Sequence, residues 1–135
     1  MTHRQTTVIP DTNFLIYLFK HRINFDYELS RVLNSSYEVV ILECIVEELK
    51  KLKKELKGSE KLSANLALKL IERYRISDYD VGSYADEKIM NYAMENENVV
   101  VCTNDKNLKR KLLEAGIPII IIKQKNHFEL QGTVF

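Results

Sequence analysis

The chain has 135 residues, of which 45% are hydrophobic and 29% are charged, and its formal net charge is +1 at pH 7. This size and composition predict one globular domain over residues 1–135 and exclude a disordered or fibrous chain. A net charge near zero also means that any binding of nucleic acid must depend on where the basic residues lie.

The N-terminus and the apolar runs indicate a cytoplasmic protein. MTHRQTT has no apolar stretch behind a basic one, so no secretion signal is expected. The longest aliphatic run, 117–122, is broken by Pro118 and is too short to cross a bilayer, so no membrane partner is expected. Cys44 and Cys102 lack the spacing of metal ligands and are expected to be reduced thiols.

Apolar β-type segments alternate with helical patterns along the chain. Gly58 is expected to stop the longest helix in the manner of a C-terminal cap. In chain order, the patterns predict strand 6–10, helices 13–19 and 26–33, strand 38–42, helices 44–57 and 62–73, an extended piece around Ile76, helix 85–96, strand 99–102, helix 106–115 and strand 119–122. The tail from Lys123 has no clear pattern. Continuous apolar strands between helices favour a parallel sheet covered on both faces, which is a three-layer α/β/α sandwich.

Aspartates lie where the strands of this sheet are expected to end. Asp11 follows the first strand, Asp105 follows VVVCTN, and Asp86 opens the helix after the short extended piece. Open parallel sheets bind ligands outside the carboxyl ends of their strands, so the three are candidates for a site. Each taken singly is more commonly a helix cap, and Ser83 with Asp86 matches a capping box. The pattern leaves both roles open.

Glu48 lies one turn into the helix that follows the strand EVVIL. It comes three residues after Ile45 and four before Leu52, in line with the core-facing stripe, whereas Glu47 can pair with Lys51 on the solvent side. A carboxylate at the margin of a buried face needs a cation, a hydrogen-bond donor or a raised pKa. Four carboxylates at one strand end repel one another until a divalent cation neutralises them. Hard oxygen ligands suit Mg²⁺ or Mn²⁺ and argue against zinc.

Four motifs in order resemble those of the PIN-domain ribonuclease family. They are Asp11-Thr12-Asn13, CIVEELKKL (44–52), GSYADE (82–87) and TNDKNLKRKL (103–112), and the likeness covers nearly the whole chain. The later part is similar to the archaeal and eukaryotic PIN proteins linked to ribosomal RNA processing. The resemblance implies a Mg²⁺- or Mn²⁺-dependent endoribonuclease whose sheet has five parallel strands in the order 3-2-1-4-5. By the same resemblance, the catalytic and metal-binding positions are Asp11, Glu48, Asp86 and Asp105, and the supporting positions are Asn13, Thr103 and Glu87.

An RNA partner requires positive charge near the carboxylates. Two groups of basic residues could contact RNA: one contains Lys50, Lys51, Lys53, Lys54, Lys57 and Lys61, and the other, which starts beside Asp105, contains Lys106, Lys109, Arg110 and Lys111. A run of charge on a helix is about as often a solvated face, so the sequence leaves this open. The preferred setting is ribosomal RNA maturation, with a homodimer or a pre-ribosomal particle as the working assembly.

Three other interpretations compete with this one. A VapC-like toxin nuclease, held inactive by an antitoxin, has the same fold and the same chemistry. A phosphoacceptor signalling domain would use Thr103 and Lys123, but there is no paired acid beside Asp11 and no aspartate at the end of an apolar third strand. A PIN module that binds RNA without cleaving it is disfavoured by the complete set of four acids.

Overall fold

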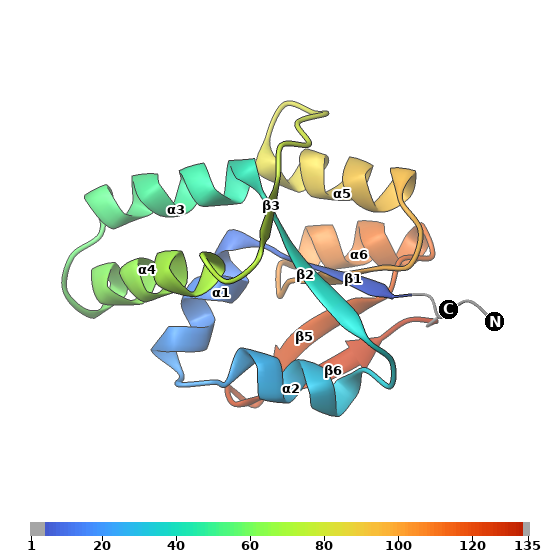
Figure 1. Cartoon of the computed structure of the whole chain (residues 1–135), viewed down its shortest axis with the longest axis horizontal. Coiled ribbons are helices and arrows are strands. Elements are labelled where there is room, and N and C mark those ends of the chain that lie inside the picture. The colour runs from blue at the N-terminus through green and yellow to red at the C-terminus, as the bar shows by residue number, and fades with distance from the viewer. Residues whose placement is uncertain (1–4, 134–135) are drawn as a thin grey trace.

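The computed structural model describes residues 5–133, in which helices and strands alternate as the sequence predicts (Figure 1). The elements are β1 (Thr6–Pro10), α1 (Thr12–Lys20), α2 (Phe25–Val32), β2 (Tyr37–Leu42), α3 (Glu43–Glu55), α4 (Gly58–Ile71), β3 (Arg75–Ser77), α5 (Ala85–Glu95), β4 (Val99–Cys102), α6 (Lys106–Glu114), β5 (Ile119–Lys123) and β6 (His127–Gln131). The expected short strand around Ile76 is β3, which pairs with β2.

The sheet has six strands in the order β3-β2-β1-β4-β5-β6. The first five are parallel, which confirms the predicted order of the parallel part. The predicted count of five strands is wrong, because β6 adds an antiparallel edge that pairs Phe128 with Ile122. This strand was not predicted because HFELQ alternates only two apolar residues, Phe128 and Leu130, over five positions, and of these only Phe128 is fully buried.

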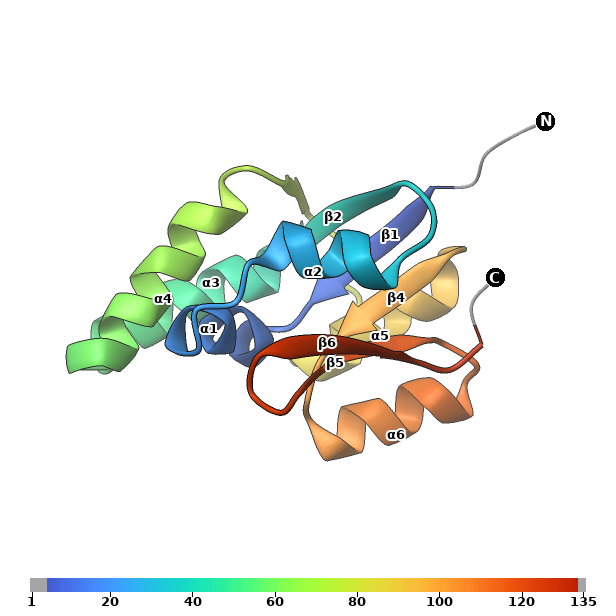
Figure 2. The same cartoon turned by 90° about the horizontal axis from the view of Figure 1, so that it is seen from below.

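Helices cover both faces of the sheet, as the α/β/α prediction requires. Helices α5 and α6 lie together on one side and α2 lies on the other, where it contacts β6 (Figures 1 and 2). Helices α3 and α4 lie side by side at one end of the molecule. No helix within residues 5–133 is long and apolar enough to cross a membrane.

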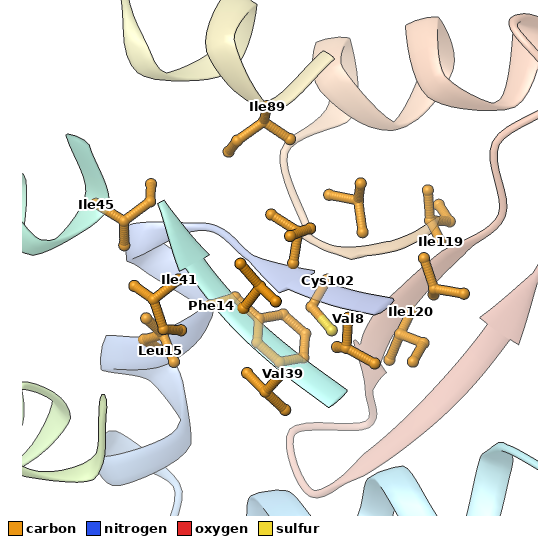
Figure 3. Packing of buried hydrophobic residues seen from close by; sticks show 14 of the residues in the cluster. Val8, Phe14, Leu15, Val39, Ile41, Ile45, Ile89, Cys102, Ile119 and Ile120 are labelled. Atoms are coloured by element: carbon orange, nitrogen blue, oxygen red, sulfur yellow. The ribbon is translucent and has the colours of Figure 1, made fainter. Parts of the chain in front are cut away.

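The core is formed by the apolar strands and the inner faces of the helices. Figure 3 shows Phe14 of α1 beside the sheet, and Ile89 of α5 approaching from the other face. Cys102 is buried in β4 and Cys44 is half-buried, and both are free thiols, as expected.

The connection between α3 and α4 differs from the prediction for Gly58. Helix α3 already ends at Glu55, with Leu56 as its C-cap, and Gly58 begins α4 with φ +62°. Glycine adopts positive φ without steric cost, and here that freedom turns the chain from one helix into the next. The residue therefore starts the second helix of the pair and does not stop the first.

Candidate active site

The site lies at the carboxyl ends of the two central strands. In the register of β1 and β4, Pro10 is opposite Cys102, and the backbone N–H of Asp11 donates to the carbonyl of Cys102 over 3.0 Å. This contact continues the pairing by one residue beyond the strands. It therefore places Asp11 beside Thr103, although 92 positions separate them in the sequence.

Asp11 uses both of its carboxylate oxygens inside the protein. One accepts a hydrogen bond of 2.8 Å from the backbone N–H of Phe14 and caps α1, and the other accepts a short hydrogen bond from the hydroxyl of Thr103. The side chain is only 8% exposed. The two roles that the sequence left open for Asp11 are thus compatible, since capping needs only one oxygen.

Thr103 joins the two central aspartates. It is fully buried, and its hydroxyl oxygen accepts a hydrogen bond of 3.1 Å from the backbone N–H of Asp105 while its proton goes to Asp11. Asp105 caps α6 by accepting from the N–H of Leu108 over 2.8 Å. These contacts restrict the rotation of both carboxylates.

A cavity of about 150 Å³ brings the four predicted acids together. Asp11 follows β1, Glu48 comes from α3, Asp86 from α5 and Asp105 from the start of α6. The cavity is also lined by Thr12, Asn13, Ile45, Ala85 and Ile89. Four elements distant in sequence therefore point carboxylates at one space.

The pKa values of two of the four carboxyl groups, Asp11 and Asp86, are raised. Burial raises the pKa of Asp11 from 3.8 to about 6, and the charges of Asp86 and Asp105 add to this, whereas the hydrogen bonds from Thr103 and Phe14 oppose it. Desolvation raises the pKa of Asp86 as well, with contributions from the charges of Asp105 and Glu48. An excess of negative charge in a partly buried space is an environment that a cation relieves.

The residues around the cavity fit a hard divalent cation by their chemistry. The four acidic side chains offer only oxygen atoms as ligands, which hard cations prefer. The buried hydroxyl oxygen of Thr12, which lines the same cavity, has no hydrogen-bond partner. Among the described residues, no three acidic, histidine or cysteine side chains converge tightly enough to form a ready ligand shell. The donor set is thus suitable, but the structure contains no preassembled shell.

The supporting residues differ in where they lie. Asn13 is exposed at the start of α1 and lines the cavity. Glu87 instead accepts a hydrogen bond of 2.9 Å from the backbone N–H of Ser83. The predicted capping box is therefore wrong, because Ser83 pairs with Glu87 and not with Asp86. The N-cap of α5 is Tyr84, whose side chain makes no capping hydrogen bond. Asp86 therefore makes no cap and lines the cavity.

The basic residues predicted to contact RNA do not all lie near the acids. Lys50 and Lys54 line a separate groove of about 730 Å³ between α3 and α4, with Val46 and Leu68 on its floor. Lys50 comes two residues after Glu48, which is about 200° around a helix, so the groove opens away from the acidic cavity. On α6, Arg110 pairs with Glu114 at 3.4 Å. RNA contact by any of these basic residues stays a prediction.

One residue of the neighbouring cavity, Tyr84, was missing from the predicted RNA contacts, whereas Lys111 belongs to the predicted basic group beside Asp105. Tyr84 and Lys111 line a second cavity that shares Asp86 and Asp105 with the first. The spacing of Lys111 from Asn107, four residues on one helix, indicates that both face the same side, and this signal was available in the sequence. Nothing in the sequence marks Tyr84 as one of the two exposed tyrosines, with Tyr27, among seven.

Comparisons with known proteins show which family the chain resembles. A family model described as a PIN like domain matches residues 8–125. The ribonuclease VapC4 of Methanocaldococcus jannaschii is 58% identical over 129 residues, which cover 94% of this chain and 98% of the relative. The rRNA-processing protein fcf1 of Schizosaccharomyces pombe is 32% identical over 119 residues, covering 85% of this chain and 58% of the relative. The structure of the PIN domain endonuclease Utp24 matches with a TM-score of 0.77 and 28% identity, covering 95% of this chain and 92% of that one.

Proposed function

The chain belongs to the PIN-like domain family together with the ribonucleases to which it is similar, and we propose that it hydrolyses RNA phosphodiester bonds with a divalent cation held at the acidic cavity. The observation that carries the proposal is the meeting of Asp11, Glu48, Asp86 and Asp105 at one cavity. That cavity lies where the strand order reverses, between β1 and β4, and open parallel sheets bind their ligands at this point.

We assign the cation to these four carboxylates. When bound, Mg²⁺ or Mn²⁺ would polarise the phosphate and lower the pKa of an attached water. Asp11 and Asp105 are the best direct ligands, because Thr103 and the caps of α1 and α6 hold their carboxylates in place. Glu48 and Asp86, which are exposed as Asp105 is, complete the ligand set from α3 and α5.

The raised pKa of Asp11 has a consequence for metal loading. A carboxyl group with a pKa of about 6 keeps its proton in a large fraction of molecules at mildly acidic pH. Since ligation needs the ionised carboxylate, a proton and a cation compete for the same oxygen. We therefore expect cation affinity to fall as the pH drops through 6.

Two biological settings are consistent with the relatives. One is ribosomal RNA maturation, as the name of the rRNA-processing protein fcf1 suggests. The other is a toxin nuclease paired with an antitoxin, as in the VapC type, and the chain spans almost the whole length of VapC4 but 58% of fcf1. Both imply an RNA partner in the cytoplasm. Crosslinking the protein to RNA in its own cells distinguishes them: enrichment of ribosomal RNA processing junctions favours maturation, and enrichment of tRNA or mRNA favours the toxin.

The proposed activity is tested with the full chain and labelled single-stranded RNA. Cleavage should require added Mg²⁺ or Mn²⁺ and stop with EDTA, since all proposed acidic ligands are hard oxygens. RNA binding should weaken as salt rises, because contacts between lysine or arginine and phosphate release counterions. An Asp11→Asn preparation purified in parallel controls for contaminating ribonuclease. Cleavage that survives chelation, or that the variant retains in full, would contradict the proposal.

A further inference from the structure

A second cavity of about 310 Å³ adjoins the proposed catalytic cavity. It lies between α5 and α6, and Asp86 and Asp105 line both spaces. A polymer bound across the four carboxylates would therefore place its neighbouring residue in this second cavity. The lining of the cavity then decides what that residue can be.

The second cavity combines an aromatic ring, a cation and an amide. Tyr84 is 58% exposed and lies outside the hydrophobic core, so its ring contributes little to folding. Lys111 lies close enough to lower the pKa of Asp86 by its charge. Asn107 adds a side chain that both donates and accepts hydrogen bonds, and Met90 adds an apolar wall. This set differs from the acidic cavity, which contains no basic side chain.

The loop that carries Tyr84 is held in place by several contacts. Asn91 donates to the carbonyl of Val81 over 2.8 Å, and Lys88 forms an ion pair with Asp80. The hydrogen bond from Ser83 to Glu87 closes the loop onto α5. These bonds tie the loop just before Tyr84 to α5, which begins just after it, so binding a partner against the ring would cost little conformational entropy.

We infer that the second cavity binds a nucleobase next to the scissile phosphate, with the base stacked on Tyr84 and Lys111 contacting a phosphate of the same strand. The inference rests on the proposed ribonuclease function and names a subsite of that same site. Proteins that bind single-stranded nucleic acid stack unpaired bases on aromatic rings beside a basic backbone contact. Carboxylates repel phosphates, so a cation such as Lys111 is needed where the strand leaves the acidic cavity. Stacking tolerates every base, and Asn107 is placed to add a preference at the base edge.

The stacking step is tested without cleavage, by titrating the protein with AMP in Mg²⁺ and following the tyrosine ring signals by NMR. AMP should shift the ring signals of Tyr84, and ribose 5-phosphate, which has no base, should not. Tyr27, which is 64% exposed on α2, is the control and should be unchanged. An unmoved Tyr84 at saturating AMP, or an equal shift with ribose 5-phosphate, would overturn the inference.

Substitutions test the same subsite in the reaction. Tyr84→Ala should lower kcat/KM for single-stranded RNA roughly 5- to 150-fold, mainly through KM, whereas Tyr84→Phe should stay close to wild type because it keeps the ring. Lys111→Gln should weaken RNA binding and reduce its salt slope by about 1, and Lys111→Arg should retain both. A Tyr84→Ala protein that behaves like a Tyr27→Ala protein would overturn the inference. If RNA is not cleaved at all but AMP still shifts Tyr84, the ribonuclease proposal fails while the base-binding cavity remains.

Discussion

Replacing Asp11 by asparagine tests the electrostatics of the acidic cavity through protein stability. Burial raises the pKa of this carboxyl group from 3.8 to about 6. Because the folded-state pKa lies above the unfolded value, the folded protein binds the proton more tightly, and the free energy of unfolding falls as the pH rises from about 4 to about 6. The difference between the two pKa values corresponds to about 3 kcal/mol. Ionised Asp11 thus destabilises the fold at neutral pH by an amount of that order.

Asparagine has nearly the same shape and no charge. Its amide oxygen can still accept the hydrogen bond from the backbone N–H of Phe14, so the cap of α1 is retained. We expect Asp11→Asn to be more stable than wild type at neutral pH by up to about 3 kcal/mol, and the two proteins to become equal below about pH 4. An aspartate that acts only as a cap would instead give little change at any pH, because asparagine caps a helix about as well as aspartate.

Urea unfolding between about pH 4 and pH 8 in EDTA measures this difference, and Glu47→Gln, at an exposed position of α3, is the control for loss of one negative charge. Added Mg²⁺ should then stabilise wild type more than Asp11→Asn, since binding to the native state stabilises by mass action. A difference in the free energy of unfolding between wild type and Asp11→Asn that is the same at every pH would refute the argument. So would an asparagine variant that is less stable than wild type near pH 8.

Two further substitutions address the acids of α3 and the bridge between the aspartates. Glu48→Gln should reduce RNA cleavage on the order of 100-fold or more, whereas Glu47→Gln should retain it, because only Glu48 lines the cavity. Equal activities of the two variants in a cleavage assay would show that the wrong face of α3 has been assigned to the site. Thr103→Val should lower the free energy of unfolding by about 1–3 kcal/mol, since it leaves Asp11 and the N–H of Asp105 without their partner. Thr103→Ser keeps the hydroxyl and should fall close to wild type in thermal unfolding, so a serine variant as unstable as valine would argue against the bridge.

The parts of the site that the sequence could predict are those attached directly to a strand. Asp11 follows β1 directly, and Asp105 follows β4 after two residues. Predicting each strand from its apolar run therefore also predicts where the carboxylate after it lies. Helical spacing likewise predicted the inward side of Glu48, which lines the cavity. In each case the information is local, because the periodicity of side chains along one element sets the direction in which a neighbouring residue points.

Other features depend on contacts between elements and could not be read along the chain. The pattern S-x-x-D favoured Asp86 as a cap, but the turn before α5 is closed by Glu87. Lys50 and Lys54 resemble RNA contacts in composition, yet the packing of α3 on α4 turns them toward a different groove. Strand β6 has only two alternating apolar residues of its own, and it is held by pairing with β5 and by Glu28, whose carboxylate accepts a hydrogen bond from the backbone N–H of Phe128.

The amino-acid sequence by itself determined the order of the elements, the parallel sheet and the four carboxylates, because hydrophobic periodicity and strand ends are local properties. Only the tertiary structure decided that Thr103 joins Asp11 to Asp105, and that Tyr84 and Lys111 border the acidic cavity. The physical reason is that a hydrogen bond or a shared cavity forms only when side chains from two separate elements are brought next to each other. The rotation of each helix against the sheet, which sets that place, is fixed by packing over the whole core.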